Sequence, residues 1–290
     1  MRRPPQDSKP RDRQDRGPRR RTGQRRAGCT TGFTITELLV VVGLIAVLIS
    51  LLLPVLGRVR AAANSATCLA NLRQMNTAWH IYLVENRGRL PHYAQSTPSV
   101  PEIGWRSYWP GVLETYRVQG DALLCPAARE PIPYNQAGLK GSGNVNYAWS
   151  GKWHTPGTVA RLNSDIYRTS SYGYNDRLTP EGKFDPASTK VVRISQIKNV
   201  TEVPVFFDCS CIDAHPENWS VTIPAQPPHD LHGELPVGAP DHWRFLIARH
   251  GRAINVGFAD GSARRVPLEE TYMLQWAAIW EKYRLTLPPF

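Results

Sequence analysis

The feature that most constrains this chain is an uncharged apolar run over residues 38–56, which is bounded by Glu37 and Arg58. As a helix rising about 1.5 Å per residue, the run would reach roughly 30 Å, the thickness of the hydrocarbon core of a bilayer. The sequence therefore predicts a single membrane-spanning helix near the N-terminus. A carboxylate at the edge of such a helix is costly, so we expect Glu37 to have a function.

Most of the positive charge lies in front of this apolar run. Residues 1–32 contain 11 Lys and Arg and 3 Asp and Glu, a net charge of +8, so the rest of the chain carries only +3 of the total of +11. Basic residues that flank an apolar span remain in the cytoplasm. The net charge of +3 on residues 33–290 is too small to indicate a nucleic-acid partner. For the leader itself, a DNA- or RNA-binding arm is the alternative interpretation.

The stretch Gly32-Phe33-Thr34-Ile35-Thr36-Glu37, followed by the apolar run, resembles the N-terminal signature of type IV pilins and type II secretion pseudopilins. In that family a prepilin peptidase cleaves between Gly and Phe, and the new N-terminal Phe is N-methylated. The resemblance implies that the leader, residues 1–32, is removed and that Phe33 becomes the first mature residue. It also places Glu37 and Pro54 at positions that serve helix assembly in the family.

Two other export signals fit the sequence less well. A secretory signal could be cleaved at Ala61-Ala62-Ala63, but the apolar run is longer than a signal core of about 7–15 residues, and Arg58 and Arg60 intervene. A lipoprotein anchor needs a cysteine directly after the apolar run, and the chain has none there.

The helical pattern continues beyond the apolar run. Apolar residues recur at three- and four-residue steps, which predicts one helix from about Phe33 to about Asn86. Its first half would lie in lipid or against sister helices, and its second half on a folded domain. A kink is expected near Pro54, because proline removes a backbone hydrogen bond. The predicted stripe comprises Val59, Ala62, Ala63, Ala66, Leu69, Ala70, Leu72, Met75, Trp79 and Tyr82.

The middle of the chain, residues 88–245, has few regular patterns. Only residues 191–194 and 203–207 are candidate strands, because they are rich in β-branched or aromatic side chains. Many Trp and Tyr residues are scattered through this region. We expect them to pack under long loops, and carbohydrate binding by exposed aromatic rings is the alternative.

The C-terminal region is more regular. Residues 253–259 alternate apolar with small or polar side chains, as in a strand. Asp260-Gly261 then predicts a tight hairpin turn into a returning strand at residues 262–266. An aromatic stripe predicts a closing helix over residues 268–284. The expected fold class is α+β and pilin-like: a leader (1–32), a long helix (33–88) that spans the membrane over 38–56, and a globular domain (89–290).

His250, nine residues and then Asp260-Gly261 resemble the H-X9-DG domain at the C-termini of pilin-like proteins from planctomycete-type bacteria. This segment covers residues 250–261. A strand of ten residues at about 3.3 Å per residue separates its ends by roughly 33 Å, so His250 and Asp260 are not expected to share a catalytic centre. We expect Asp260 to make an Asx-type turn hydrogen bond and His250 to cap the other end of the strand.

No catalytic site, cofactor or metal ligand is predicted. His229, Asp230 and His232, with Asp241 and His242 nearby, are ligand-type residues at short spacing, but a single pair in a Pro-rich loop is a weak indication of zinc. The sequence contains no nucleophile elbow, phosphate-binding loop or dinucleotide-binding glycine pattern. The aromatic and ligand-type residues therefore do not indicate an enzyme.

Removal of the leader takes Cys29 and leaves four cysteines. An even number outside the cytoplasm permits disulfides in three pairings. Cys209 and Cys211 are too close in sequence for an easy mutual bridge, which favours long-range pairs such as Cys68 with Cys125. Buried free thiols are the alternative.

The resemblance implies a structural protein of the inner (cytoplasmic) membrane, single-pass, with its C-terminal domain in the periplasm or outside the cell. It would be a pilin or pseudopilin subunit of a type II secretion pseudopilus or a pilus-like filament. Its implied partners are a prepilin peptidase, the inner-membrane assembly machinery and other pilin-like subunits. The alternative is a membrane-tethered binding domain that does not polymerise.

Overall fold

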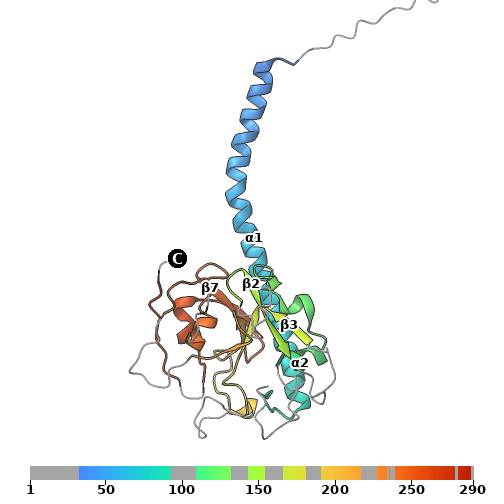
Figure 1. The fold of residues 1–290 in the computed structure, drawn as a ribbon, viewed down its shortest axis with the longest axis vertical. Coiled ribbons are helices and arrows are strands. Elements are labelled where there is room, and N and C mark those ends of the chain that lie inside the picture. The colour runs from blue at the N-terminus through green and yellow to red at the C-terminus, as the bar shows by residue number, and fades with distance from the viewer. Residues whose placement is uncertain are drawn as a thin grey trace, which may run out of the picture. The chain divides into compact units, whose positions relative to one another are not determined.

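A computed structural model describes residues 33–92, 109–131, 143–153, 166–180, 191–216, 227–233, 235, 239–277 and 280–288 of the 290-residue chain. The leader and its cleavage-site residue Gly32 lie outside these ranges. The described part is α+β, with one long helix and two small sheets. Figure 1 shows β2, β3 and β7 grouped around the C-terminal half of the long helix α1.

The predicted long helix is present as α1 (Ile35–Glu85), which is 51 residues long and continues through Pro54. Internal contacts divide the chain into two compact units, Met1–Leu52 and Leu53–Phe290, so the second half of α1 belongs to the globular unit. By length and composition, α1 is the helix among the described residues that could cross a membrane. The kink expected at Pro54 stays a prediction.

The second half of α1 is packed within the globular unit, but its buried face differs from the predicted stripe. Leu72, Met75 and Trp79 are buried as expected, whereas Val59 is 58% exposed. The stripe was extended too far toward the N-terminus, because its apolar spacing continues through Val59, Ala62, Ala63 and Ala66, which are exposed. The buried residues of α1 are Cys68, Leu72, Met75, Asn76, Ala78, Trp79 and Leu83.

A five-stranded sheet lies against this half of α1. Its strands in spatial order are β6 (Asp213–Ala214), β4 (Tyr172–Asn175), β5 (Pro204–Asp208), β7 (Ala253–Phe258) and β8 (Ala263–Pro267). β4 pairs with β6 in parallel, and the other neighbours are antiparallel. The hairpin expected at Asp260-Gly261 is present, with Gly261 at φ +89°.

All six residues of β7 are buried, so the small or polar side chains of this strand do not face solvent. They face α1: Ser65 Oγ donates to Asn255 Oδ1 at 3.2 Å, and Asn76 Nδ2 donates to the Phe258 carbonyl at 3.2 Å. The alternation therefore marks a strand that is covered on both faces.

The middle region contains more strands than expected. A separate sheet comprises β1 (Glu130–Pro131), β2 (Tyr147–Trp153) and β3 (Ile166–Ser170). Residues 203–207 were correctly expected to be extended, because β5 covers most of them. The strand expected at residues 191–194 is wrong: Arg193 makes only an isolated bridge with Arg89, and a 3-10 helix, η4 (Ile194–Gln196), begins at the next residue.

The remaining elements are short helices. They are α2 (Trp109–Thr115), η2 (Gly120–Leu123), η5 (Asp241–Arg244) and η6 (Leu268–Met273). The closing helix expected over residues 268–284 is wrong beyond η6. Trp276 is buried and stacks on Phe245 with ring centroids 4.6 Å apart, so tertiary aromatic packing overrides the helical spacing.

Candidate functional site

The start of α1 is organised by Thr34 and Glu37. The Thr34 N–H and hydroxyl donate to Glu37 Oε2 at 2.8 and 2.7 Å, and the Glu37 N–H donates to Thr34 Oγ1 at 3.2 Å. This reciprocal arrangement is a capping box, which satisfies helix N–H groups that lack intrahelical partners. Thr34-x-x-Glu37 is the sequence signal from which this capping box could have been predicted. Glu37 therefore stabilises the first turn of α1 and also places a carboxylate there.

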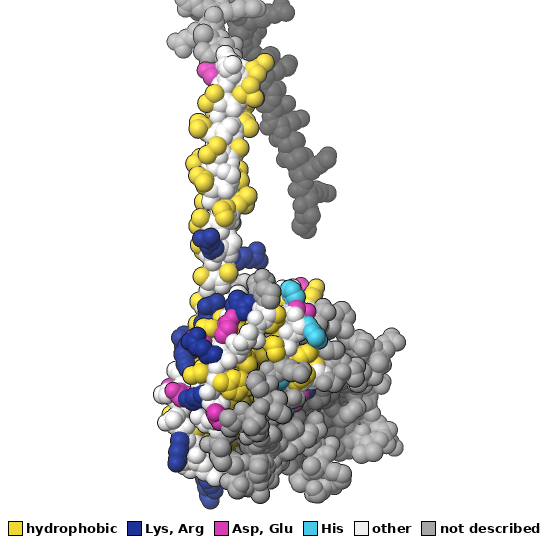
Figure 2. Space-filling model, turned by 90° about the vertical axis from the view of Figure 1, so that its left-hand side faces the viewer, with side chains coloured by type: hydrophobic (Ala, Val, Ile, Leu, Met, Phe, Trp, Pro, Cys, Tyr) yellow, Lys and Arg dark blue, Asp and Glu magenta, His cyan; other side chains and the backbone are white. Residues whose placement is uncertain are grey.

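The residues after Glu37 form a helix with an apolar surface on all sides. The large hydrophobic side chains from Phe33 to Val59 are 43–77% exposed, and Figure 2 shows hydrophobic side chains along the length of this part of the helix. An exposed apolar surface of this length needs lipid or another protein to cover it. This surface can act in membrane insertion and in helix–helix assembly.

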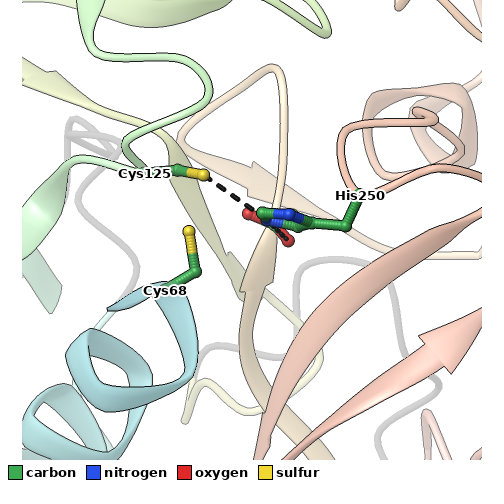
Figure 3. A group of neighbouring side chains, drawn as sticks. Cys68, Cys125 and His250 are labelled. Carbon is green, nitrogen blue, oxygen red and sulfur yellow. Dashed lines mark hydrogen bonds and ion pairs between the residues drawn. The ribbon is translucent and has the colours of Figure 1, made fainter. Parts of the chain in front are cut away.

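A second candidate site surrounds His250. Its imidazole lies beside Cys68 from α1, Cys125 from the loop after η2, and Asp208 at the end of β5; Figure 3 shows both cysteines and His250 directed toward a common centre. Their ligand-type atoms all lie within 4.8 Å of one another. We call these four residues the Cys–Asp–His cluster.

The His250 Nε2 atom makes two close contacts in this cluster. It lies 3.4 Å from Cys125 Sγ and 3.3 Å from Asp208 Oδ2. Burial opposes ionisation of the Cys125 thiol, but its hydrogen bonds with Cys68 and His250 outweigh burial and lower its pKa to about 6. Burial also favours neutral His250, yet hydrogen bonds to Asp208 and Cys125 raise its pKa to about 9. Proton-sharing contacts thus stabilise charge inside the protein.

Neighbouring groups hold Asp208 in place. The Asn255 N–H donates to Asp208 Oδ2 at 2.7 Å, and Arg249 Nη1 lies 3.5 Å from Oδ1. The Arg249 and Asp208 side chains have no exposed surface. Cys68 and Cys125 are also fully buried, so neither thiol presents a nucleophile to a substrate at the surface.

The two ends of the H-X9-DG segment have different roles. Asp260 Oδ1 accepts from the Ser262 N–H at 2.9 Å, which is the expected Asx-type bond. The expected capping role of the His250 side chain is wrong, because the imidazole enters the Cys–Asp–His cluster. Sequence spacing could not show this, since the partners of His250 come from distant segments.

The other ligand-type residues singled out in the sequence do not gather in one place. Asp230 accepts from the His232 N–H at 2.8 Å in a local turn, and His229 packs edge-on to Trp243. Asp241 instead lies near His215, whose Nδ1 is 2.9 Å from Asp176 Oδ2. Arg244 pairs with Asp241 and supplies positive charge there, so we interpret this group as an ion-pair network.

The four cysteines in the described residues are buried, and no disulfide joins them in this structure. The structure brings Cys68 and Cys125 together, as expected for the favoured long-range pair. Cys209 lies at the end of β5, where Cys211 N–H approaches Cys209 Sγ at 3.5 Å. The disulfide itself stays a prediction.

Comparisons with known proteins give no relative. The chain matches no protein-family model, no curated protein and no solved structure.

Proposed function

We propose that the chain is a pseudopilin-like structural subunit. A prepilin peptidase would cleave it between Gly32 and Phe33, and the mature helix would enter a secretion pseudopilus or a pilus-like filament. The observation that supports the proposal is that the two halves of one continuous helix differ: the first is apolar and exposed, and the second is packed in the globular unit. The apolar run over residues 38–56 is exposed, whereas the helix from Cys68 to Leu83 is anchored in a folded unit.

An all-round apolar helix suits two environments. Before assembly it would lie in the inner membrane, where lipid covers it and its backbone hydrogen bonds are internal. After assembly, neighbouring helices would replace the lipid. A helix that only tethered a domain would need the first environment and not the second.

Glu37 supports the assembly step. In the free chain its carboxylate is held by Thr34, which satisfies hydrogen bonds but supplies no positive charge. Cleavage after Gly32 would create an α-amine on Phe33. The amine of one subunit would pair with Glu37 of the next, because a buried carboxylate without a counter-charge costs several kcal/mol.

The proposal is tested by expressing the chain together with a prepilin peptidase and its assembly machinery. Mass spectrometry of the mature wild-type protein should give an N-methylated Phe33 as the first residue. Cysteines introduced into residues 38–56 should crosslink wild-type subunits into a series of covalent oligomers. In Glu37→Ala, processing should persist while the oligomer series is lost.

Glu37→Gln is the matched control for the helix cap, because Gln can still accept from Thr34 but carries no charge. It should behave like Glu37→Ala if the charge pair drives assembly. Normal assembly of Glu37→Gln would remove the charge-pairing role. A mature N-terminus near Asn64 would overturn the whole proposal, and N-methylated wild type without oligomers would favour a tethered binding domain.

A further inference from the structure

The Cys–Asp–His cluster brings together atoms from four separate segments. Cys68 is on α1, Cys125 follows η2, Asp208 ends β5, and His250 precedes β7. Sequence separations of this size mean that only the completed fold assembles the group. The four side chains contribute two sulfurs, one nitrogen and one carboxylate oxygen within 4.8 Å of one another.

The side chains around His250 point toward one common centre, unlike those of a proton relay. A Cys–His–Asp proton relay uses both ring nitrogens, one toward the thiol and the other toward the carboxylate. Here the same nitrogen, Nε2, faces Cys125 Sγ at 3.4 Å and Asp208 Oδ2 at 3.3 Å. These groups therefore surround a common centre.

We propose that Cys68, Cys125, Asp208 and His250 bind one Zn²⁺ ion in a tetrahedral site. Zinc lies about 2.3 Å from cysteine sulfur and about 2.0–2.2 Å from histidine nitrogen and carboxylate oxygen, so adjacent ligand atoms are roughly 3.3–3.8 Å apart. The two distances at His250 match this spacing. A site closed by four protein ligands is structural, because no position is left for water or substrate.

The ligand types select a borderline-soft metal. Two thiolates and an imidazole favour zinc over calcium or magnesium, which prefer oxygen ligands. A disulfide between Cys68 and Cys125 would use the two sulfurs only. Such a disulfide is uncharged, so it would not interact electrostatically with the buried side chains of His250 and Asp208 beside it.

Charge balance supports the cation. Two thiolates and one carboxylate carry three negative charges when His250 is neutral. A Zn²⁺ ion and the fully buried Arg249 guanidinium, 3.5 Å from Asp208 Oδ1, carry three positive charges. Binding would release the protons that the ligands carry before the ion arrives, and it exchanges no electrons.

Outer groups orient the ligands, as is usual at metal sites. Asp208 Oδ2 accepts from the Asn255 N–H at 2.7 Å, and the Asn71 side chain donates to the Tyr172 hydroxyl at 3.3 Å on the Cys68 side. A groove of about 590 Å³ is lined by His250 and Gly251 together with Ser65 and Leu69 of α1. This groove gives an ion a path from solvent to His250.

The test uses the full-length chain in detergent, reduced and freed of metal with a chelator. Addition of Co²⁺ should produce the sulfur-to-cobalt charge-transfer band and the visible bands of a tetrahedral site, at one cobalt per chain. Zinc should displace the cobalt. Cys125→Ser and His250→Gln should each weaken cobalt binding by at least the roughly 10- to 100-fold that loss of an outer-shell residue costs.

Cys211→Ser is the matched control, because Cys211 is a buried thiol outside the cluster, and it should bind cobalt as the wild type does. Alkylation of the cysteine thiols, mapped by mass spectrometry, tests zinc binding on the wild type even where a variant fails to fold. Zinc should slow the modification of Cys68 and Cys125 relative to Cys209 and Cys211. No tetrahedral cobalt spectrum in the reduced wild type, or an unchanged spectrum in Cys125→Ser, would overturn the site. So would a Cys68–Cys125 disulfide whose reduction yields no metal binding.

Discussion

At the scale of single residues, Asp176 shows how burial can dominate the acid–base behaviour of a carboxyl group. Its side chain is 1% exposed, and its Oδ2 atom lies 2.9 Å from His215 Nδ1. Burial raises the pKa of Asp176 to about 6, against the partial compensation that His215 provides, and the nearby Asp213 and Asp241 act in the same direction as burial. Ionised Asp176 is therefore a cost to the folded state near neutral pH.

This cost predicts a pH dependence of stability. Because the folded pKa of Asp176 exceeds its unfolded value, the folded state binds more protons, and its contribution to stability falls as pH rises through about 6. Between about pH 7 and about pH 5 the wild type should gain about 1 kcal/mol relative to Asp176→Asn, which cannot titrate. Urea unfolding followed by tryptophan fluorescence at each pH measures the difference. A difference that is constant, or that shrinks on acidification, would mean that Asp176 stays ionised and paired with His215.

Individual residue roles were predictable only where they are local. The turn bond of Asp260 follows from its spacing to Ser262, and the capping box follows from Thr34-x-x-Glu37. The role of His250 depends on partners located in three other segments, and no local pattern encodes them. For this reason local sequence patterns predicted a capping role for His250 and could not place its imidazole beside Cys68, Cys125 and Asp208.

At the scale of elements, the packing of α1 on β7 depends on a close approach. Asn76 Nδ2 donates to the carbonyls of Phe258 and Ser262 at 3.2 and 3.1 Å, which ties the helix to the hairpin. A Cβ at Gly257 would lie 2.7 Å from Asn76 Nδ2. The small residue in the strand therefore makes room for the amide that binds the turn.

This contact predicts non-additive substitutions. Gly257→Ala should destabilise the protein by about 1–3 kcal/mol through overpacking. Asn76→Ala should cost a similar amount, about 1–3 kcal/mol, because the carbonyls of Phe258 and Ser262 each lose one of their two hydrogen bonds and keep only the backbone one. The double variant should be less destabilised than the sum, since the alanine methyl can occupy the space left by Asn76. Thermal or urea unfolding of the four proteins measures the coupling, and strict additivity would mean that the two side chains do not interact.

Elements were predictable where the pattern is long or the turn chemistry is specific. The unbroken apolar run and its continuation specify α1, and Asp260-Gly261 specifies the β7–β8 hairpin. The expected closing helix failed because Trp276 gains more from stacking on Phe245 than from continuing η6. Strands of the middle region were missed because several are very short and are completed by pairing with distant segments.

At the scale of the whole molecule, the charge asymmetry around the apolar run matters most for the proposed function. The leader, residues 1–32, carries +8, whereas Arg58 and Arg60 are the basic residues close to the other end of the run. Because the more positive flank of a span usually stays in the cytoplasm, we expect the leader to lie on that side. The globular unit should therefore be delivered outside the cytoplasm, where a filament subunit must be.

This orientation is testable with an alkaline phosphatase fused to the C-terminus, since that enzyme is active only after export. The wild-type fusion should be active. Replacement of the leader arginines nearest the run, residues 19–21, 25 and 26, by glutamine should lower the activity several-fold, because Arg58 and Arg60 then carry the larger share of nearby positive charge. The same change at Arg264 and Arg265 should have no effect, because these residues are far from the run in sequence. Full activity after neutralisation of the leader would mean that the globular unit is exported independently of the leader charge, which would leave the cleavage signature as the leader's remaining role.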